Sequence, residues 1–299
     1  MKTTLIFGLL AIFGLEAASG QREYPPVLEG VREVVYKTVG ERELKLWVVA
    51  PEEKPTAEKR VPGVVFFFGG GWRKGTPGQF IEQGKHLAGR GMVAFLADYR
   101  VSERDGTKAK DCVEDAKSAM RWVRERAGEF GVDPERLAAG GGSAGGHLAA
   151  AVALVPGFDA FGENDELSAR PDALLLFNPA VEIPPVEKVG REPQWEEILR
   201  ERLGCEPAAI SPAGFVKDGV KVPPTVIFHG TKDDAVPIGS VRRFRDAVVK
   251  FGGRCELEEY GGRPHGFFNF GRGGGKDYRD TVEKMDAFLV SLGWLKGTE

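Results

Sequence analysis

Short apolar runs alternate with longer amphipathic stretches along most of the chain. Most runs are continuous, which is typical of strands that are buried on both faces of a parallel sheet. We predict strands over residues 64–68, 92–97, 137–139, 173–177, 224–228 and 255–260. Two earlier segments, 31–36 and 44–49, instead alternate apolar and polar residues, so they predict an antiparallel pair joined by a turn around Gly40-Glu41.

The stretches between these strands have the spacing of amphipathic helices. Residues 111–130, for example, carry apolar side chains at intervals of three and four, so these side chains share one face of a helix. We expect that helix to end at Gly131 and the residues Val132-Asp133-Pro134 to turn the chain. Helices are predicted over 80–90, 111–130, 194–203, 241–251 and 277–292, with a further one starting near Leu148. This alternation predicts an α/β fold, with a mostly parallel central sheet and helices on both faces.

One segment interrupts the alternation of strands and helices. Residues 181–222 are rich in proline and charge and contain no convincing strand. Elsewhere there is no internal repeat and no interdomain linker, so we predict one catalytic domain over residues 21–299 that carries 181–222 as an insertion. We interpret the insertion as a lid over a site at the sheet edge; the alternative is a surface excursion without a role.

The first residues have the organisation of a signal peptide. Lys2 supplies a positive charge, residues 5–15 are apolar, and Ala18-Ser19-Gly20 offers a cleavage site of small residues. We therefore predict a signal peptide over 1–20 and an exported protein, periplasmic or secreted. The apolar run is short for a transmembrane helix, although an uncleaved anchor is the alternative.

Composition and charge exclude several classes of partner. The 299 residues carry a formal net charge of −3 and no long run of like charge, so neither nucleic acid nor an anionic membrane is an expected partner. Cys112, Cys205 and Cys255 are the three cysteines; at most one pair can form, and their pairing stays open. Because they lack Cys-x-x-Cys spacing and histidine neighbours, we expect no metal site, and no motif indicates a cofactor.

The most informative stretch is Gly141-Gly142-Ser143-Ala144-Gly145-Gly146 between a predicted strand and a predicted helix. Its Gly-x-Ser-x-Gly core is the pattern of a nucleophile elbow. Such a turn holds the serine in a sparsely populated backbone conformation, and it needs small neighbours because strand and helix approach closely. The alternative interpretation is a glycine-rich turn with an incidental serine.

A serine nucleophile needs a base and a group that orients the base. His265 lies in a loop after the last predicted strand, and we predict it to be the base. Asp233 and Asp234 both follow the preceding strand, and we prefer Asp233 as the orienting acid. The other histidines, His86, His147 and His229, are expected to be structural, with His229 bonded to the loop toward Asp233. All these strand ends should meet at one edge of the sheet.

The oxyanion that forms when such a serine attacks a carbonyl group needs N–H donors. Ala144, directly after the serine, supplies one, and the Gly69-Gly70-Gly71 turn can supply others. The same glycines lack the spacing and the Lys-Ser/Thr of a phosphate-binding loop.

With these motifs in view, the chain resembles the α/β-hydrolase superfamily, in the branch of acetyl esterases and hormone-sensitive-lipase-like carboxylesterases. The matching motifs are Phe67-Phe68-Gly69-Gly70-Gly71-Trp72, Asp98-Tyr99-Arg100, the Ser143 elbow, His229-Gly230-Thr231-Lys232-Asp233 and His265-Gly266-Phe267. The resemblance implies Ser143, Asp233 and His265 as catalytic residues and Gly70, Gly71 and Ala144 as the oxyanion hole.

Two residues depart from the family pattern. Phe68 stands where the family usually has a histidine that braces the oxyanion loop, and Gly142 stands where lipase-like members often have aspartate. The second departure suggests the acetyl-esterase side of the branch.

The function predicted from the sequence is therefore an exported serine hydrolase of short-chain carboxylic esters, an acetyl esterase acting on carbohydrate esters. The alternatives are a serine peptidase of the prolyl-oligopeptidase type and a non-catalytic binding protein on the same fold. Small-molecule or carbohydrate esters are the expected partners. The sequence leaves the acyl length, the alcohol and the oligomeric state open.

Overall fold

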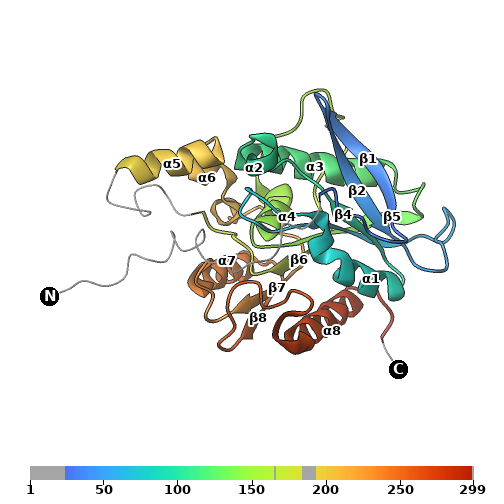
Figure 1. The fold of residues 1–299 in the computed structure, drawn as a ribbon. Helices are drawn as coiled ribbons and strands as arrows, with labels where there is room; N and C mark the ends of the chain where they lie inside the picture. Colours follow the sequence, from blue (N-terminus) through green and yellow to red (C-terminus); the bar gives the residue numbers. More distant parts are fainter. Residues whose placement is uncertain (1–23, 165, 184–192, 298–299) are drawn as a thin grey trace.

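An eight-stranded sheet forms the centre of the protein (Figure 1). A computed structural model describes residues 24–164, 166–183 and 193–297, so the predicted signal peptide 1–20 lies outside the described residues. The strands are β1 (Arg32–Val39), β2 (Arg42–Val49), β3 (Val61–Phe67), β4 (Val93–Ala97), β5 (Val132–Gly142), β6 (Ala173–Phe177), β7 (Thr225–Gly230) and β8 (Cys255–Tyr260). Their order across the sheet is β1-β2-β4-β3-β5-β6-β7-β8.

The sheet is parallel except at one edge. β1 pairs with β2, and β2 with β4, in antiparallel register, whereas all the remaining neighbours are parallel. The predicted N-terminal pair of antiparallel strands and the mostly parallel sheet are thereby confirmed. The carboxyl ends of β3, β5, β7 and β8 consequently lie along the same edge, where ligand sites of open α/β sheets gather.

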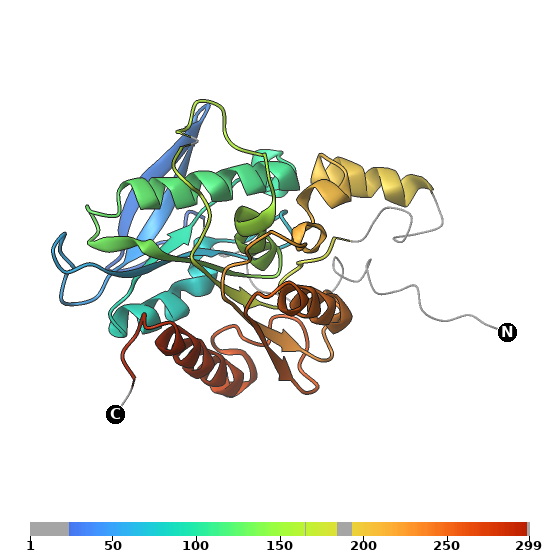
Figure 2. The ribbon, with the colours of Figure 1, turned by 180° about the vertical axis from the view of Figure 1, so that it is seen from behind.

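Helices cover both faces of the sheet, as predicted. The helices are α1 (Ile81–Gly89), α2 (Ser102–Asp105), α3 (Ala109–Glu125), α4 (Ala144–Leu154), α5 (Pro193–Leu203), α6 (Pro207–Ile210), α7 (Ile238–Lys250) and α8 (Lys276–Ser291), with 3-10 turns η2 (Pro77–Phe80), η4 (Pro212–Phe215) and η5 (Arg272–Gly275). The apolar side chains of α3, α4 and α7 belong to one buried cluster and those of α1 and α8 to another. Figure 2 shows α3, α4 and α7 on the near face, with α1 and α8 below.

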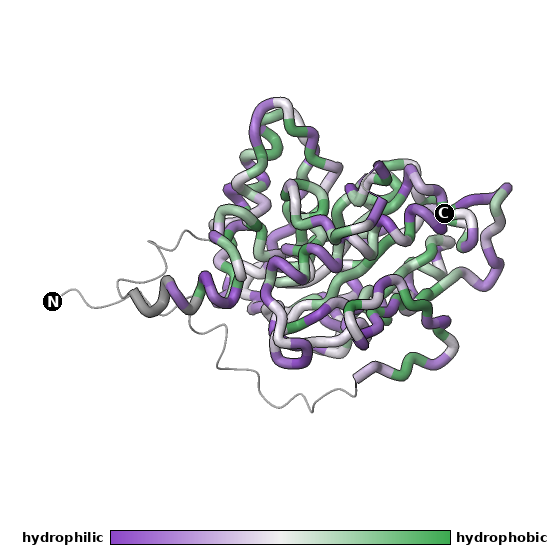
Figure 3. Tube along the Cα trace, turned by 90° about the horizontal axis from the view of Figure 1, so that it is seen from above, coloured by the Kyte–Doolittle hydropathy of each residue, from purple (hydrophilic) through white to green (hydrophobic). Residues whose placement is uncertain are grey.

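The core lies between the sheet and these two layers. Side chains of the central strands such as Val65, Phe66 and Leu175 are no more than 1% exposed, and Figure 3 shows hydrophobic stretches along the middle of the trace with hydrophilic turns around it. Burial of both faces explains why these strands are continuously apolar in the sequence.

Two predicted boundaries before the elbow are wrong. The helix predicted over 111–130 ends at Glu125, and turns occupy the residues before Gly131. The predicted turn at 132–134 lies within β5, which already pairs at Val132 with Val61. The predicted turn does coincide with an irregularity, because the register between β5 and β3 shifts after Val132 and regular pairing resumes only at Leu137. Pro134 lacks an N–H for the ladder and interrupts it without ending the strand.

The insertion 181–222 contains the predicted helix, as α5, and two further short turns, α6 and η4. Leu203 and Ile210 are fully buried, so this part of the insertion packs on the rest of the protein. Residues 184–192 lie outside the described part of the chain, and the role of the insertion as a lid stays a prediction.

The three cysteines are not paired with one another. Cys112 lies buried in α3, Cys255 is buried at the start of β8, and Cys205 is half-buried after α5. In the described part of the chain, no helix has the length and apolar character needed to cross a membrane.

Candidate active site

Ser143 occupies a strained turn between β5 and α4. Its backbone has φ 55° and ψ −117°, a conformation that non-glycine residues rarely adopt. The approach of strand and helix explains its small neighbours. A Cβ on Gly141 would lie 2.5 Å from the carbonyl oxygens of Gly145 and Phe67, and one on Gly145 would lie 2.0 Å from Phe67 O. The local sequence therefore folds as an elbow because positions 141 and 145 have room only for glycine.

Three side chains from separate strand ends form one hydrogen-bonded line. His265 Nε2 lies 3.0 Å from Ser143 Oγ, and His265 Nδ1 lies 2.8 Å from Asp233 Oδ2. The other carboxylate oxygen of Asp233 accepts the N–H groups of Ala235 and Val236 at 2.9 and 2.8 Å. These bonds hold the carboxylate, which is buried while its neighbour Asp234 is exposed. The structure thus brings together the three residues predicted to be catalytic, with Asp233 rather than Asp234 facing the histidine.

The other histidines lie outside this line. His229 is fully buried, and its Nε2 lies 2.8 Å from Val236 O and 3.5 Å from Asp233 Oδ2. Burial lowers the pKa of His229, so a neutral imidazole donates to Val236 O and fixes the loop that carries Asp233. His86 instead lies on α1 and contacts Asp286 of α8 at 3.0 Å.

His147 connects the elbow helix to two other segments. Its Nδ1 accepts the indole N–H of Trp72 at 3.3 Å, and its Nε2 donates to Ile210 O at 2.6 Å. The first contact reaches the loop after β3 and the second reaches the insertion. Burial lowers the pKa of His147 to about 4. The ring is therefore neutral near pH 7, with its proton on Nε2.

The loop at residues 68–75, here called the oxyanion loop, aims its free N–H groups by fixing the neighbouring carbonyls. Gly70 O accepts the N–H groups of Arg73 and Lys74 at 3.1 and 3.3 Å. Because a trans peptide directs its C=O and N–H in opposite senses, the N–H of Gly71 points away from that turn. Among the described residues, no hydrogen-bond acceptor faces the N–H of Gly70 or Gly71.

The elbow orients Ala144 in the same way. The carbonyl oxygen of Ser143 accepts the N–H groups of His147 and Ala180 at 2.9 and 3.2 Å. The N–H of Ala144, in the same peptide, therefore points out of the first turn of α4, where helix N–H groups lack intrahelical partners. Ala144 thus has an N–H without an intrahelical partner next to Ser143, and the oxyanion loop approaches Ser143 at Gly69, where a Cβ would lie 3.4 Å from Ser143 Cβ.

The oxyanion loop is braced without the family's histidine. Phe68, which replaces it, is 1% exposed and stacks on Tyr99 with ring centroids 4.0 Å apart. The hydroxyl of Tyr99 donates to Phe68 O at 2.6 Å, and the next N–H, of Gly69, donates to Gln79 Oε1 at 2.6 Å. Both ends of one peptide are therefore held, and the guanidinium of Arg202 on α5 donates to Gly71 O.

Packing also explains the second departure from the family pattern. A Cβ on Gly142 would lie 2.6 Å from Cζ of Phe268, a ring that is 1% exposed and lies three residues after His265. The side chain of an aspartate at position 142 would clash with this ring, so the buried Phe268 requires glycine there.

Several residues at the site were not singled out from the sequence, among them Gln79, Asn178, Arg202 and Asn269. Asn178 follows β6 directly, has φ 36°, and accepts the N–H of Gly266 at 3.0 Å. Its position after a strand was a usable signal, like those of Ser143 and Asp233. The remaining three lie in the short turn η2, in the loop after β8 and on α5 of the insertion, and nothing in the sequence connects them to the site.

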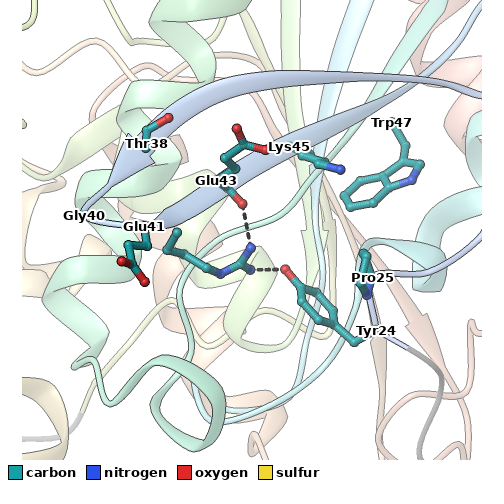
Figure 4. A pocket seen from close by; sticks show the side chains of 9 residues that line it. Tyr24, Pro25, Thr38, Gly40, Glu41, Glu43, Lys45 and Trp47 are labelled. Atoms are coloured by element: carbon teal, nitrogen blue, oxygen red, sulfur yellow. Dashed lines mark hydrogen bonds between the residues drawn. The ribbon is translucent and has the colours of Figure 1, made fainter.

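A cavity of about 350 Å³ lies away from the Ser143 line, at the turn between β1 and β2 (Figure 4). It is lined by residues that include Tyr24, Glu43 and Trp47, and Arg42 crosses it to the hydroxyl of Tyr24. Arg42 and Tyr24 also bind Asp98, so these contacts anchor the start of the described chain on the sheet.

Comparison with solved structures gives close matches over almost the whole chain. The structure of the thermophilic esterase Est2 from the planctomycete Thermogutta terrifontis is 48% identical and covers 92% of this chain and 97% of its own, with a TM-score of 0.87. The same esterase has been solved with propionate bound and phosphonylated by sarin.

Curated relatives match a smaller part of their own length. A probable isoprenylcysteine alpha-carbonyl methylesterase of Oryza sativa is 29% identical over 246 residues, which is 78% of this chain and 56% of the relative. The probable carboxylic ester hydrolase LipM of Mycobacterium tuberculosis is 29% identical over 60% of this chain and 43% of its own. The chain thus spans about half the length of the curated relatives it matches.

Fold and relatives together define a member of the α/β-hydrolase superfamily, in its hormone-sensitive-lipase-like branch, and the relatives named above are esterases or probable ester hydrolases. A sequence model of the family described as BD-FAE matches residues 51–248, about two thirds of the chain. The chain belongs to the BD-FAE family.

Proposed function

We propose that the protein hydrolyses short-chain carboxylic esters through an acyl-enzyme on Ser143. In this proposal His265 is the general base and acid, Asp233 orients His265, and the N–H groups of Gly70 and Gly71, with that of Ala144, bind the oxyanion. The observation that carries the proposal is the continuous line from Ser143 Oγ through His265 to Asp233, with 3.0 and 2.8 Å between the heavy atoms.

The geometry suits a two-step reaction. His265 Nε2 takes the proton of Ser143 Oγ as the oxygen attacks the ester carbonyl, and Asp233 stabilises the imidazolium through Nδ1–H. The carbonyl oxygen becomes negative beside the free N–H groups, each of which typically contributes about 3 kcal/mol to lowering the barrier. His265 then gives its proton to the leaving alcohol. Water, deprotonated by the same nitrogen, releases the acid and restores Ser143.

We further propose short acyl groups, and acetyl esters of carbohydrates, as the substrates. The propionate-bound and butyrate-bound structures of the Thermogutta esterase support a short acyl group. The small residues of the elbow and the predicted export to a compartment where polysaccharides occur motivate the carbohydrate alcohol. Export itself rests on the pattern of residues 1–20.

A panel of aryl esters from acetyl to decanoyl tests the acyl preference. We expect kcat/KM to be highest from acetyl to butyryl and to fall by octanoyl. The variant Ser143→Ala should lose at least about a thousandfold in kcat while its unfolding midpoint stays near that of the wild type. Absence of turnover by the wild type on every ester would contradict the proposed function.

Acetylated xylan, assayed beside the panel, tests the alcohol. Release of acetate from the polymer at a rate near that from aryl acetate supports a carbohydrate ester. Turnover of aryl acetate without release from xylan would remove the carbohydrate part and leave the esterase.

Export has a test of its own. Expression of the full chain in a bacterial host, followed by cell fractionation and N-terminal sequencing, should find mature protein beginning near Gln21 outside the cytoplasm. Full-length protein in the cytoplasm would contradict export.

A further inference from the structure

Two loops that are far apart in the sequence meet beside Ser143 through a pair of side-chain amides. One is the oxyanion loop, residues 68–75, and the other is the histidine loop, residues 261–271, which carries His265. Gln79 follows the first loop and Asn269 belongs to the second. Gln79 Nε2 donates to Asn269 Oδ1 at 2.9 Å, across 190 residues of sequence.

The amide pair continues into the backbone on both sides. Gln79 Oε1 accepts the N–H of Gly69 at 2.6 Å, and Asn269 Nδ2 donates to Gly266 O at 2.8 Å. A chain of three hydrogen bonds therefore connects Gly69, which precedes the predicted oxyanion donors, to Gly266, which follows His265. On the far side, the N–H of Gly266 donates to Asn178 Oδ1 at 3.0 Å, which holds the other end of the same residue.

The chemistry of the two ends fixes the direction of these bonds. The backbone N–H of Gly69 can only donate, so it requires the carbonyl oxygen of Gln79. The carbonyl of Gly266 can only accept, so it requires the amide nitrogen of Asn269. These two constraints leave the nitrogen of Gln79 facing the oxygen of Asn269, and each amide makes its bonds without conflict.

We propose that Gln79 and Asn269 are positioning residues for catalysis, which hold the oxyanion loop in register with His265. The proposal rests on the ester hydrolase function proposed above. Attack and oxyanion binding occur at the same carbonyl, so the N–H donors and the imidazole must keep a constant separation around it. The histidine that normally braces the oxyanion loop is Phe68 here, and the amide pair supplies a brace that also reaches the base.

Substitution of each amide tests the proposal. Gln79→Ala and Asn269→Ala should each lower kcat on an aryl acetate by about 10- to 100-fold, the size of effect that a misplacement near 1 Å produces, with KM changed by less than about twofold. The double variant should lose no more than the worse single variant, because either substitution alone breaks the connection. Rates are expressed per site titrated with paraoxon, so that unfolded protein does not count.

Asn269→Asp separates this role from simple support of Gln79. The aspartate side chain keeps an oxygen for Gln79 Nε2 but has no donor for Gly266 O, so only the backbone N–H of residue 269, at 3.2 Å, still donates to that carbonyl. We expect it to remain as slow as Asn269→Ala. Wild-type kcat in Asn269→Asp would show that the histidine loop need not be tied, and would overturn the proposal even if the alanine variants were too unstable to assay.

The controls distinguish failure of the Gln79–Asn269 proposal from failure of the proposed function. Asn164→Ala removes an exposed amide in another loop and should leave kcat within about twofold of the wild type. If the wild type hydrolyses esters and both alanine variants match it, only the tie is refuted. If the wild type is inactive on all esters, the proposed function itself fails.

Discussion

Replacement of His147 by glutamine should change how stability depends on pH. The imidazole is fully buried between Trp72 and Ile210. A second proton would have to enter at Nδ1, which already faces the indole N–H. Burial lowers the pKa of His147 to about 4 from its ordinary value of 6.5. The glutamine amide can accept from Trp72 and donate to Ile210 O, but it has no proton to gain.

The sign and size of the effect follow from proton linkage. Below pH 6.5 His147 becomes protonated in the unfolded chain, whereas in the folded protein it stays neutral down to about pH 4. The contribution of His147 to stability is thus complete above pH 6.5 and declines as the pH falls toward 4. Each unit of pKa difference corresponds to about 1.4 kcal/mol. Between pH 7 and pH 5 the wild type should therefore lose about 2 kcal/mol through this residue.

Urea unfolding of the wild type and His147→Gln at pH 7 and pH 5 measures this contribution. Other titrating groups change stability in both proteins and cancel in the difference between them. The wild type should lose about 2 kcal/mol more than the variant over this interval. Equal losses in the two proteins would refute a neutral, buried His147 with a lowered pKa.

Three further substitutions test the packing around the elbow and the oxyanion loop. Gly142→Ala places a Cβ 2.6 Å from the ring of Phe268 and should lower the free energy of unfolding by about 1–3 kcal/mol. The control Gly89→Ala has nothing within 4 Å of the added Cβ, and its free energy of unfolding should stay within about 1 kcal/mol of the wild type. Equal effects of the two substitutions in urea unfolding would contradict this packing. Phe68→His restores the family residue in an apolar site and should destabilise by about 1–3 kcal/mol without raising kcat; a higher kcat would mean that the loop still lacks a brace. Arg202→Met removes the donor to the carbonyl of Gly71 and should lower kcat on aryl acetate about tenfold, equivalent to about 1.4 kcal/mol; an unchanged kcat would show that α5 does not support the loop.

The elements that position the site could be predicted because their signals are local. A continuously apolar strand followed by glycines locates Ser143, and the ends of later strands locate Asp233 and His265. Parallel strands place their carboxyl ends on one edge, so the sequence alone predicts that these side chains meet. Asp233 and Asp234 both fit by position in the sequence, which favours Asp233, and the fold separates them, because Asp233 is buried and Asp234 is exposed.

Features that depend on tertiary contacts could not be predicted from the sequence. Gln79 lies in the short turn η2 and Asn269 in the histidine loop, and their contacts arise only because two distant segments meet. The early start of β5 was missed because Pro134 is a strong turn signal. The strand nevertheless continues through the proline, because β5 pairs with β3 on both sides of it, at Val132 and from Leu137 onward. The end of α3 at Glu125 was missed because apolar residues continue in the turns beyond it.

The central claim is that Ser143 is a nucleophile activated by His265. Incubation with paraoxon, followed by mass spectrometry of the intact and digested protein, tests it most directly. We predict one diethylphosphoryl group per chain, on the peptide that contains Ser143, loss of ester turnover in step with labelling, and no labelling of Ser143→Ala. Hydrolysis of aryl acetate by a protein that remains unlabelled at Ser143, or that turns over normally as Ser143→Ala, would contradict the account.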